Sequence, residues 1–261
     1  MGGSGLIISQ RRQKILDQVK DQGVVRVADL ATALLISELT VRRDLDDLAK
    51  DGLVERFHGG ARFPERPEQE ILFTEKDRLH TKNKDAIGAM AESLVKDGDT
   101  VFLNAGSTTL AVLRHLGQRK IRIITNNASA PNAIGDSRAE LLLVGGEYRA
   151  RSSSLFGDLA ILSLSQIHAT LCILGTNGIT ARNGLTTSVQ PEAAINRLMA
   201  ERCEGPIVVV ADGSKIGVTS SFACLPIAQV NTLITDNSAN ANHLEAIRAA
   251  GIQVLLCPQV E

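Results

Sequence analysis

Two adjacent arginines, Arg42 and Arg43, lie near the start of a segment with helical periodicity. Ser37 is a good helix N-cap, and the helix predicted to follow it, Glu38–Asp51, has apolar residues spaced along one face. Adjacent residues diverge by about 100° around a helix, so the two guanidinium groups cannot face the same way. One can reach a base edge and the other a phosphate, because the planar guanidinium forms bidentate hydrogen bonds with either.

A second group of residues suits anion binding. Asn104–Thr109 reads Asn-Ala-Gly-Ser-Thr-Thr, follows a predicted strand and opens a predicted helix. Small residues let the backbone approach a ligand, and successive N–H groups, hydroxyls and the positive end of a helix favour an oxyanion such as phosphate. An ordinary strand-to-helix turn capped by a hydroxyl would have the same sequence features, so this turn alone does not establish a phosphate site.

Other polar, glycine-containing loops follow the ends of further predicted strands. They are Thr125–Asn127, Gly145–Arg149, Gly175–Gly178 and Asp212–Lys215. Ligands of open α/β sheets bind at the carboxyl ends of the strands, which favours one shared pocket. The alternative is that such loops are commonly polar and rich in glycine whether or not they bind anything.

The arginines belong to a segment with the layout of a winged helix-turn-helix. Helices are predicted over Gln13–Gln22, Val27–Leu34 and Glu38–Asp51, followed by a hairpin of Leu53–His58 and Ala61–Phe63 around Gly59-Gly60. The third helix would enter the major groove with Glu38, Leu39, Thr40, Arg42 and Arg43 exposed, and Arg56, His58 and Arg62 of the hairpin would lie along phosphates or the minor groove.

Four acids near the third helix oppose this interpretation, because carboxylates repel DNA. They are Asp44, Asp46, Asp47 and Asp51. Two alternatives stay open: a small helical domain with a solvated charged surface, or a DNA-binding domain whose acids lie on the far side of the helix or form local ion pairs.

The rest of the chain predicts a separate α/β domain. Two prolines and several charges in Pro64–Glu70 indicate an extended linker. Beyond it, short apolar strands alternate with helices, which predicts a doubly wound, mostly parallel sheet covered on both faces. The strands are expected at Thr100–Leu103, Ile121–Thr125, Leu141–Val144, Ala169–Leu174, Ile207–Ala211, Leu233–Thr235 and Val254–Leu256, with helices including Lys84–Val95, Thr109–Leu116, Asp158–Ser165, Glu192–Arg202 and Asn242–Ala250. The expected domains are 1–63, a linker over 64–74, and 75–261.

Composition limits the alternatives. The formal net charge is −1, so a DNA-binding surface must come from the placement of basic residues, and 3% aromatic residues argue against binding by base stacking. The four cysteines lack metal-ligand spacing and are expected to be buried thiols. No apolar run is long enough to span a membrane and the start lacks the apolar region of a signal peptide, so a cytoplasmic protein is expected.

The segment Arg11–Phe63 closely resembles the DNA-binding domain of the DeoR family of bacterial regulators. The resemblance rests on Ser37–Leu45, which reads S-E-L-T-V-R-R-D-L, and on His58–Ala61, which reads H-G-G-A. It implies that Thr40, Arg42 and Arg43 contact DNA together with His58 and Gly59 of the wing. The full predicted set of DNA-binding residues is Ser37, Glu38, Thr40, Arg42, Arg43, Arg56, His58 and Gly59.

The remainder resembles the sensor domain of the same family, which is similar in fold to ribose-5-phosphate isomerase and glucosamine-6-phosphate deaminase. The matching motifs include D-G-D-T-V-F-L-N-A-G-S-T-T, I-T-N-N, V-G-G-E-Y-R and A-D-G-S-K-I-G. The resemblance implies that Gly106, Ser107, Thr108 and Thr109 hold an effector phosphate, and that Asn104, Thr125, Asn126, Gly146, Arg149 and Lys215 complete the pocket.

Three positions depart from the family pattern. Asn104 stands where Asp is frequent, Asn196 where Lys is frequent, and Thr180 where Asp is frequent. Each departure removes a charge from the expected pocket, which bears on the identity of the effector and disfavours a residual catalytic role.

The resulting expectation is a repressor of carbohydrate-metabolism genes that leaves double-stranded operator DNA when a phosphorylated sugar binds. It would act as a homo-oligomer, dimer or tetramer, without metal, cofactor or membrane. The alternative is a sugar-phosphate isomerase-like enzyme with a DNA-binding appendage, using Asp212 as base and Lys215 as acid. No cluster of acids supports that chemistry around Thr176–Thr180. A third interpretation is an architectural nucleic-acid protein with no ligand. The sequence does not reveal the operator, the effector sugar or the sign of regulation.

Overall fold

The computed structural model describes residues 8–51, 53–62 and 72–258. The chain divides into two compact units, 1–69 and 70–261. Most of the predicted linker, residues 64–71, lies outside the described residues. Its last two residues, Phe73 and Thr74, do not belong to an extended segment but begin helix α4 (Phe73–Arg78).

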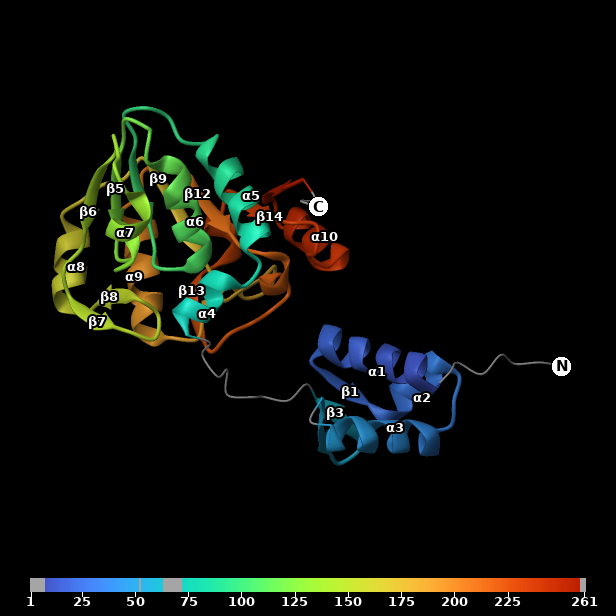
Figure 1. Cartoon of the computed structure of the whole chain (residues 1–261). Helices are drawn as coiled ribbons and strands as arrows, with labels where there is room; N and C mark the ends of the chain where they lie inside the picture. Colours follow the sequence, from blue (N-terminus) through green and yellow to red (C-terminus); the bar gives the residue numbers. More distant parts are fainter. Residues whose placement is uncertain (1–7, 52, 63–71, 259–261) are drawn as a thin grey trace. The chain divides into compact units, whose positions relative to one another are not determined.

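The N-terminal unit is a winged helix-turn-helix (Figure 1). Its elements, in chain order, are α1 (Ile8–Gln22), β1 (Val24–Arg26), α2 (Val27–Leu34), α3 (Glu38–Lys50), β2 (Glu55–Phe57) and β3 (Gly60–Arg62). The apolar faces of the helices meet in one core that includes Ile15, Leu30 and Leu45. β1 was not predicted, because three residues are too few to show an alternating pattern. It pairs with β3, so the wing is a three-stranded antiparallel sheet in the order β1-β3-β2.

Glycine is required at two positions of the wing on different physical grounds. Gly59 has φ of +90°, a backbone conformation that other residues rarely adopt, as the predicted hairpin turn requires. Gly60 has no such angle, but a Cβ there would lie 2.2 Å from the carbonyl oxygen of Val25 and 2.4 Å from the Phe57 ring. The second glycine is therefore required by the close approach of β1.

The second unit is built on a parallel sheet of seven strands in the order β15-β14-β12-β9-β4-β5-β6 (Figure 1). The strands are β4 (Thr100–Leu103), β5 (Arg122–Thr125), β6 (Glu140–Leu143), β9 (Leu171–Gly175), β12 (Ile207–Val210), β14 (Thr232–Thr235) and β15 (Gln253–Leu256). All six neighbouring pairs are parallel. The predicted α/β fold is confirmed, and each predicted strand is present: Thr100–Leu103 has the predicted ends, and the ends of the others differ by at most two residues.

Helices cover both faces of this sheet. They are α5 (Thr81–Glu92), α6 (Ser107–Leu116), α7 (Ala130–Ile134), α8 (Asp158–Ser165), α9 (Gln190–Glu201) and α10 (Ala241–Ala249). Successive strand residues enter different cores: Phe102 packs with α8 and α9, whereas Val101 and Leu103 pack with α5 and α6. Burial on both faces explains why the strands read as continuous apolar runs.

Smaller antiparallel elements, which the sequence analysis did not predict, border the carboxyl ends of the strands. One is a hairpin of β7 (Glu147–Arg149) and β8 (Ser154–Phe156), and the other is a sheet of β10 (Gly178–Thr180), β11 (Gly184–Thr187) and β13 (Phe222–Leu225). Two 3-10 turns, η1 (Gly213–Lys215) and η2 (Ile227–Gln229), complete the unit. Within the described parts of both units, the helices are too short or too polar to cross a bilayer.

Candidate functional site

The N-terminal turn of α3 presents the predicted DNA-contacting side chains to solvent. Ser37 caps the helix by accepting a hydrogen bond from the backbone N–H of Thr40 at 3.2 Å. Arg42 and Arg43 are both exposed. Arg42 forms an ion pair with Glu38 at 3.1 Å, whereas Arg43 has no hydrogen-bond or ion-pair partner among the described residues. One guanidinium is thus fully available, and the other is held only by an exposed pair of small energetic value.

The acids that opposed DNA binding are engaged by arginines. Asp44 is buried and forms ion pairs with Arg11 at 2.5 Å and Arg12 at 3.3 Å. Arg12 also pairs with Asp47, and Arg56 pairs with Asp46 at 2.9 Å. Burial would raise the pKa of Asp44, but the hydrogen bonds from the two arginines outweigh it and lower that pKa. Of the alternatives left open for these acids, local ion pairs therefore account for Asp44, Asp46 and Asp47, but not for Asp51.

Arg56, one of the predicted DNA-binding residues, instead stabilises the wing. Arg56 donates to Asp46 of α3 and, at 2.6 Å, to the carbonyl oxygen of Gly60, so it braces the wing against α3. His58 and Gly59 are exposed at the tip. The surface offered to a duplex is therefore the start of α3 and the tip of the wing, with Arg56 behind it.

In the second unit, the turn from β4 into α6 borders a cavity of about 220 Å³. Gly106, Ser107 and Thr108 line this cavity. The backbone N–H groups and hydroxyls of Ser107 and Thr108 have no acceptor or donor partner within residues 72–258. The turn thus exposes unsatisfied donors at a helix N-terminus, which is the geometry that binds an oxyanion.

Basic side chains from three other elements line the same cavity. They are Lys76 of α4, Lys84 of α5 and Lys215 of η1, with His80 between α4 and α5. Two acids, Asp212 and Glu192, also line it. The ammonium of Lys215 has no hydrogen-bond or ion-pair partner among the described residues. The cavity therefore combines helix-end donors with an excess of cations, which favours an anionic ligand.

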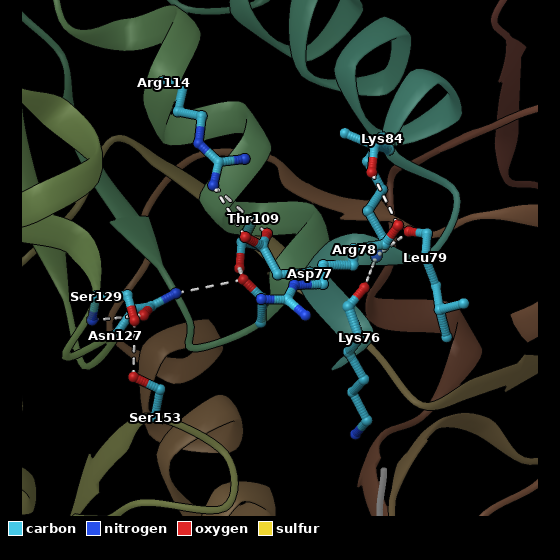
Figure 2. A network of polar contacts seen from close by, with 12 residues as sticks. Lys76, Asp77, Arg78, Leu79, Lys84, Thr109, Arg114, Asn127, Ser129 and Ser153 are labelled. Atoms are coloured by element: carbon cyan, nitrogen blue, oxygen red, sulfur yellow. Dashed lines mark hydrogen bonds and ion pairs between the residues drawn. The ribbon is translucent and has the colours of Figure 1, made fainter. Parts of the chain in front are cut away.

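Lys84 is buried, with 4% of its surface exposed, and it links the cavity to α4. Its ammonium donates to the carbonyl oxygens of Lys76 and, at 2.7 Å, Leu79 at the end of α4 (Figure 2). Asp77 of the same helix pairs with Arg114 of α6 at 3.2 Å. Burial lowers the pKa of Lys84, and nearby Asp212 opposes that effect. Helix α4 is thus held by cations from both α5 and α6.

Half of the predicted effector-binding residues line the cavity: Asn104, Gly106, Ser107, Thr108 and Lys215. The others do not: Thr109, Thr125, Asn126, Gly146 and Arg149. Thr109 is buried and donates its hydroxyl to the carbonyl oxygen of Asn104 at 2.7 Å. The hydroxyl of Thr125 accepts from the backbone of Asn127 at 3.0 Å. Thr109 therefore stabilises the turn into α6 from within, whereas Thr125 stabilises the loop that follows β5.

Asn126 and its neighbour Asn127 also support the turn from the end of β5. The Asn126 side chain accepts from the backbone N–H of Ala105 at 2.7 Å. Asn127, labelled in Figure 2, donates to the carbonyl oxygen of Gly106 at 3.3 Å. Gly146 has φ of +133° and lies against Phe156, while Arg149 donates to Ser152 at 3.2 Å. These residues shape the loops around the site rather than its lining.

Eight lining residues belong to no predicted part of the pocket: Phe73, Lys76, Leu79, His80, Lys84, Ser152, Thr187 and Glu192. The other lining residues lie in the predicted strand-end loops or at a position expected in the pocket: Ala105, Gly175, Thr176, Asn177, Asn196, Asp212 and Ser214. Four of the first eight lie in or beside α4. This helix is short and has no apolar period of its own, so the sequence pattern did not predict it. The polar loops after β9 and β12 did signal Thr176, Asn177 and Asp212. Across the described residues, His, Cys, Asp and Glu form no group that could hold a metal ion.

Two family models match the chain. A DeoR-like helix-turn-helix domain matches residues 11–67, and a DeoR C-terminal sensor domain matches residues 79–237. The first model falls within the N-terminal unit and the second within the C-terminal unit.

Two relatives match this chain over more than nine-tenths of their own length. The chain is 35% identical to the lactose phosphotransferase system repressor of Lactococcus lactis, with 90% of this chain and 94% of that protein covered. It is 32% identical to the HTH-type transcriptional regulator GlpR of Haloferax volcanii, with 96% and 98% covered. Among solved structures, ribose 5-phosphate isomerase A from Neisseria gonorrhoeae matches with a TM-score of 0.39 and 16% identity, covering 55% of each chain, which is too distant to support an argument.

Proposed function

Because the chain belongs to the DeoR family of transcriptional regulators, we propose that it represses carbohydrate-metabolism genes and leaves its operator when a phosphorylated sugar binds. Family membership, with a DNA-binding domain at the N-terminus, sets aside the alternative of an isomerase-like enzyme. We place its action in the cytoplasm, where operator DNA is found.

Double-stranded DNA is the proposed partner of the N-terminal unit. The start of α3 carries Arg42 and Arg43 on the exposed side, while ion pairs occupy Asp44, Asp46 and Asp47. A helix fits the major groove with its N-terminal residues at the base edges. Ser37, Glu38 and Thr40 belong to the same turn of the helix, and His58 and Gly59 at the wing tip would reach the flanking backbone.

The observation that carries the effector proposal is the turn of Gly106, Ser107 and Thr108 on a cavity that also contains Lys84 and Lys215. Unsatisfied N–H groups bind one face of a phosphate, and the ammonium groups compensate its charge. An uncharged sugar would leave the positive charge of the ammonium groups uncompensated. We therefore assign the phosphate to this turn and the sugar to the remaining cavity.

Helix α4 is the proposed route from the cavity to the DNA-binding unit. Among the described residues it is the first helix of the second unit, and Lys84 binds its last carbonyl groups while lining the cavity. A phosphate would compete with those carbonyl groups for the ammonium. Binding would then favour a different position of α4, which is the differential interaction that any ligand-driven switch requires.

We further propose a homo-oligomer, dimer or tetramer, on the operator. One winged helix contacts few base pairs, and two linked copies gain affinity from paired half-sites.

A gel-shift experiment on the DNA upstream of the chain's own gene tests this proposal. The expected result is a retarded complex that dissociates as one of a panel of sugar phosphates is added, while the matching unphosphorylated sugar has no effect. A complex that no phosphorylated sugar weakens would contradict the effector, and the absence of any sequence-specific complex would contradict the operator.

A further inference from the structure

Two buried amides, Asn104 and Asn196, meet at the wall of the effector cavity. Both line the cavity, and only 3% and 6% of their surfaces are exposed. The Asn104 side-chain nitrogen donates to the Asn196 side-chain oxygen at 2.9 Å. Buried polar groups are costly unless hydrogen-bonded, so the number of bonds each amide makes is informative.

The side-chain oxygen of Asn104 and both hydrogens of its amide nitrogen have hydrogen-bond partners. Its oxygen accepts from the N–H of Gly175 at 2.8 Å, and its nitrogen donates to the carbonyl oxygen of Gly175 at 2.9 Å as well as to Asn196. It therefore ties the end of β4 to the end of β9. This role is structural, and it leaves no donor for a ligand.

Asn196 accepts from Asn104 through its oxygen, but its amide nitrogen lacks a strong acceptor. An amide nitrogen carries two hydrogens, yet its one acceptor within the described residues is the sulfur of Cys224 at 3.8 Å. A thiol is a weak acceptor, and burial raises the pKa of Cys224 to about 11, so the sulfur is uncharged. The structure thus keeps a donor nine-tenths buried at the cavity without a strong acceptor.

Among the described residues, α9, β11 and the loop after β9 contribute neutral side chains and one carboxylate, Glu192, to the cavity lining, but no cation. The neutral side chains of Asn177 and Thr187 line the cavity from the loop after β9 and from β11. The Thr187 hydroxyl lies 3.0 Å from the Asn177 oxygen and 3.2 Å from Glu192, one turn before Asn196 on α9. The lysines come from α4, α5 and η1 instead, so the amides and the cations belong to separate elements.

We propose that Asn196 is a specificity-determining residue that donates a hydrogen bond to a hydroxyl or carbonyl oxygen in the uncharged part of the effector. The inference rests on the proposed function, because it assumes that the Gly106–Thr108 turn holds the phosphate. It assigns the recognition of the sugar itself to α9. Inorganic phosphate, which lacks that part, gains nothing from Asn196.

Calorimetric titration of the full chain with inorganic phosphate, ribose 5-phosphate, glucose 6-phosphate and fructose 6-phosphate tests this assignment. In Asn196→Ala, the affinity for the tightest-binding sugar phosphate should fall about three- to tenfold, while the affinity for phosphate stays unchanged. Gln190→Ala, an exposed amide on the same helix, is the matched control and should change neither. Thermal unfolding without ligand reports whether each variant is folded.

A second variant, Asn196→Asp, keeps the shape and the oxygen that accepts from Asn104 but removes the donor. Its added charge weakens both ligands, so the ratio of sugar-phosphate to phosphate affinity isolates the hydrogen bond, and that ratio should fall. An unchanged ratio in both folded variants would overturn the role of Asn196 and leave the proposed function standing. A wild-type chain that binds no sugar phosphate more tightly than phosphate would overturn both.

Discussion

Arg42 and Arg43 are the residues on which DNA recognition depends in this account. Replacing either by Ala should weaken operator binding by roughly 1–3 kcal/mol if that residue reads a base bidentately. Fluorescence anisotropy with labelled operator DNA measures the change. Lys14→Ala, an exposed cation on α1, provides a comparison with similar loss of charge. Unchanged affinity in both arginine variants would reject the assignment of α3 to the groove.

Asp44 is predicted to stabilise the N-terminal unit rather than to act in DNA binding. Asp44→Asn leaves Arg11 without its carboxylate and should cost about 3 kcal/mol of unfolding free energy. Hydrogen exchange of α1 and α3 in the full chain, followed by mass spectrometry, should show faster exchange in this variant. Exchange as slow as in the wild type would show that the ion pair contributes little.

The lowered pKa of Asp44 gives the same contact a pH dependence. A carboxyl whose pKa is lower in the folded state stabilises the fold above its unfolded pKa of about 3.9, and that stability is lost as the pH falls through the folded value. The protection of α1 and α3 against exchange, relative to the intrinsic exchange rate at each pH, should therefore fall below about pH 4 in the wild type. In Asp44→Asn this fall should be smaller.

At the scale of elements, the wing gives a matched pair of glycine variants. Gly60→Ala places a Cβ against the backbone of Val25 and should disrupt the β1–β3 pairing, with a loss of 2 kcal/mol or more, on the order of overpacked sites. Gly59→Ala has open space around it and should cost only about 1 kcal/mol, from its positive φ. Thermal unfolding compares the two. A larger loss at Gly59 would contradict this description of the wing.

Helix α4 should depend on Lys84 for its order. Lys84→Met removes the donor to the last carbonyl groups of α4, so the amides of α4 should exchange faster while those of α6 stay protected. The control is Lys82→Met, because Lys82 is an exposed lysine on α5, the helix that carries Lys84. If α4 exchanges equally in both variants, Lys84 does not hold it.

Sequence periodicity predicted the strands of the parallel sheet and the longer helices well, but it missed the short elements. The strands of the parallel sheet are buried on both faces, so their apolar runs were evident. β1, the β7–β8 hairpin and α4 are short and depend on tertiary contacts, such as the pairing of β1 with β3, that no local pattern shows. For the same reason the site was half predicted. Gly106–Thr108 follows a recognisable strand, whereas Lys84 reaches the cavity through burial against α4.

At the scale of the whole molecule, the proposed oligomer makes a prediction about the operator. Two copies bound to DNA require half-sites about one helical turn, or a multiple of a turn, apart. Inserting five base pairs between the half-sites should therefore abolish the tight complex, while inserting ten should restore part of it. Gel shifts with the three DNAs measure this. Equal affinity for all of them would indicate that the chain binds as a monomer.

The most direct test of the account is the operator affinity of the wild type and of the double variant Ser107→Ala with Thr108→Ala, each measured with and without the sugar phosphate that releases the wild type. Both chains should bind the operator equally well without ligand, because these residues lie outside the N-terminal unit. The sugar phosphate should release the wild type alone. Release of the double variant at the same concentration would contradict the claim that the Gly106–Thr108 turn senses the effector.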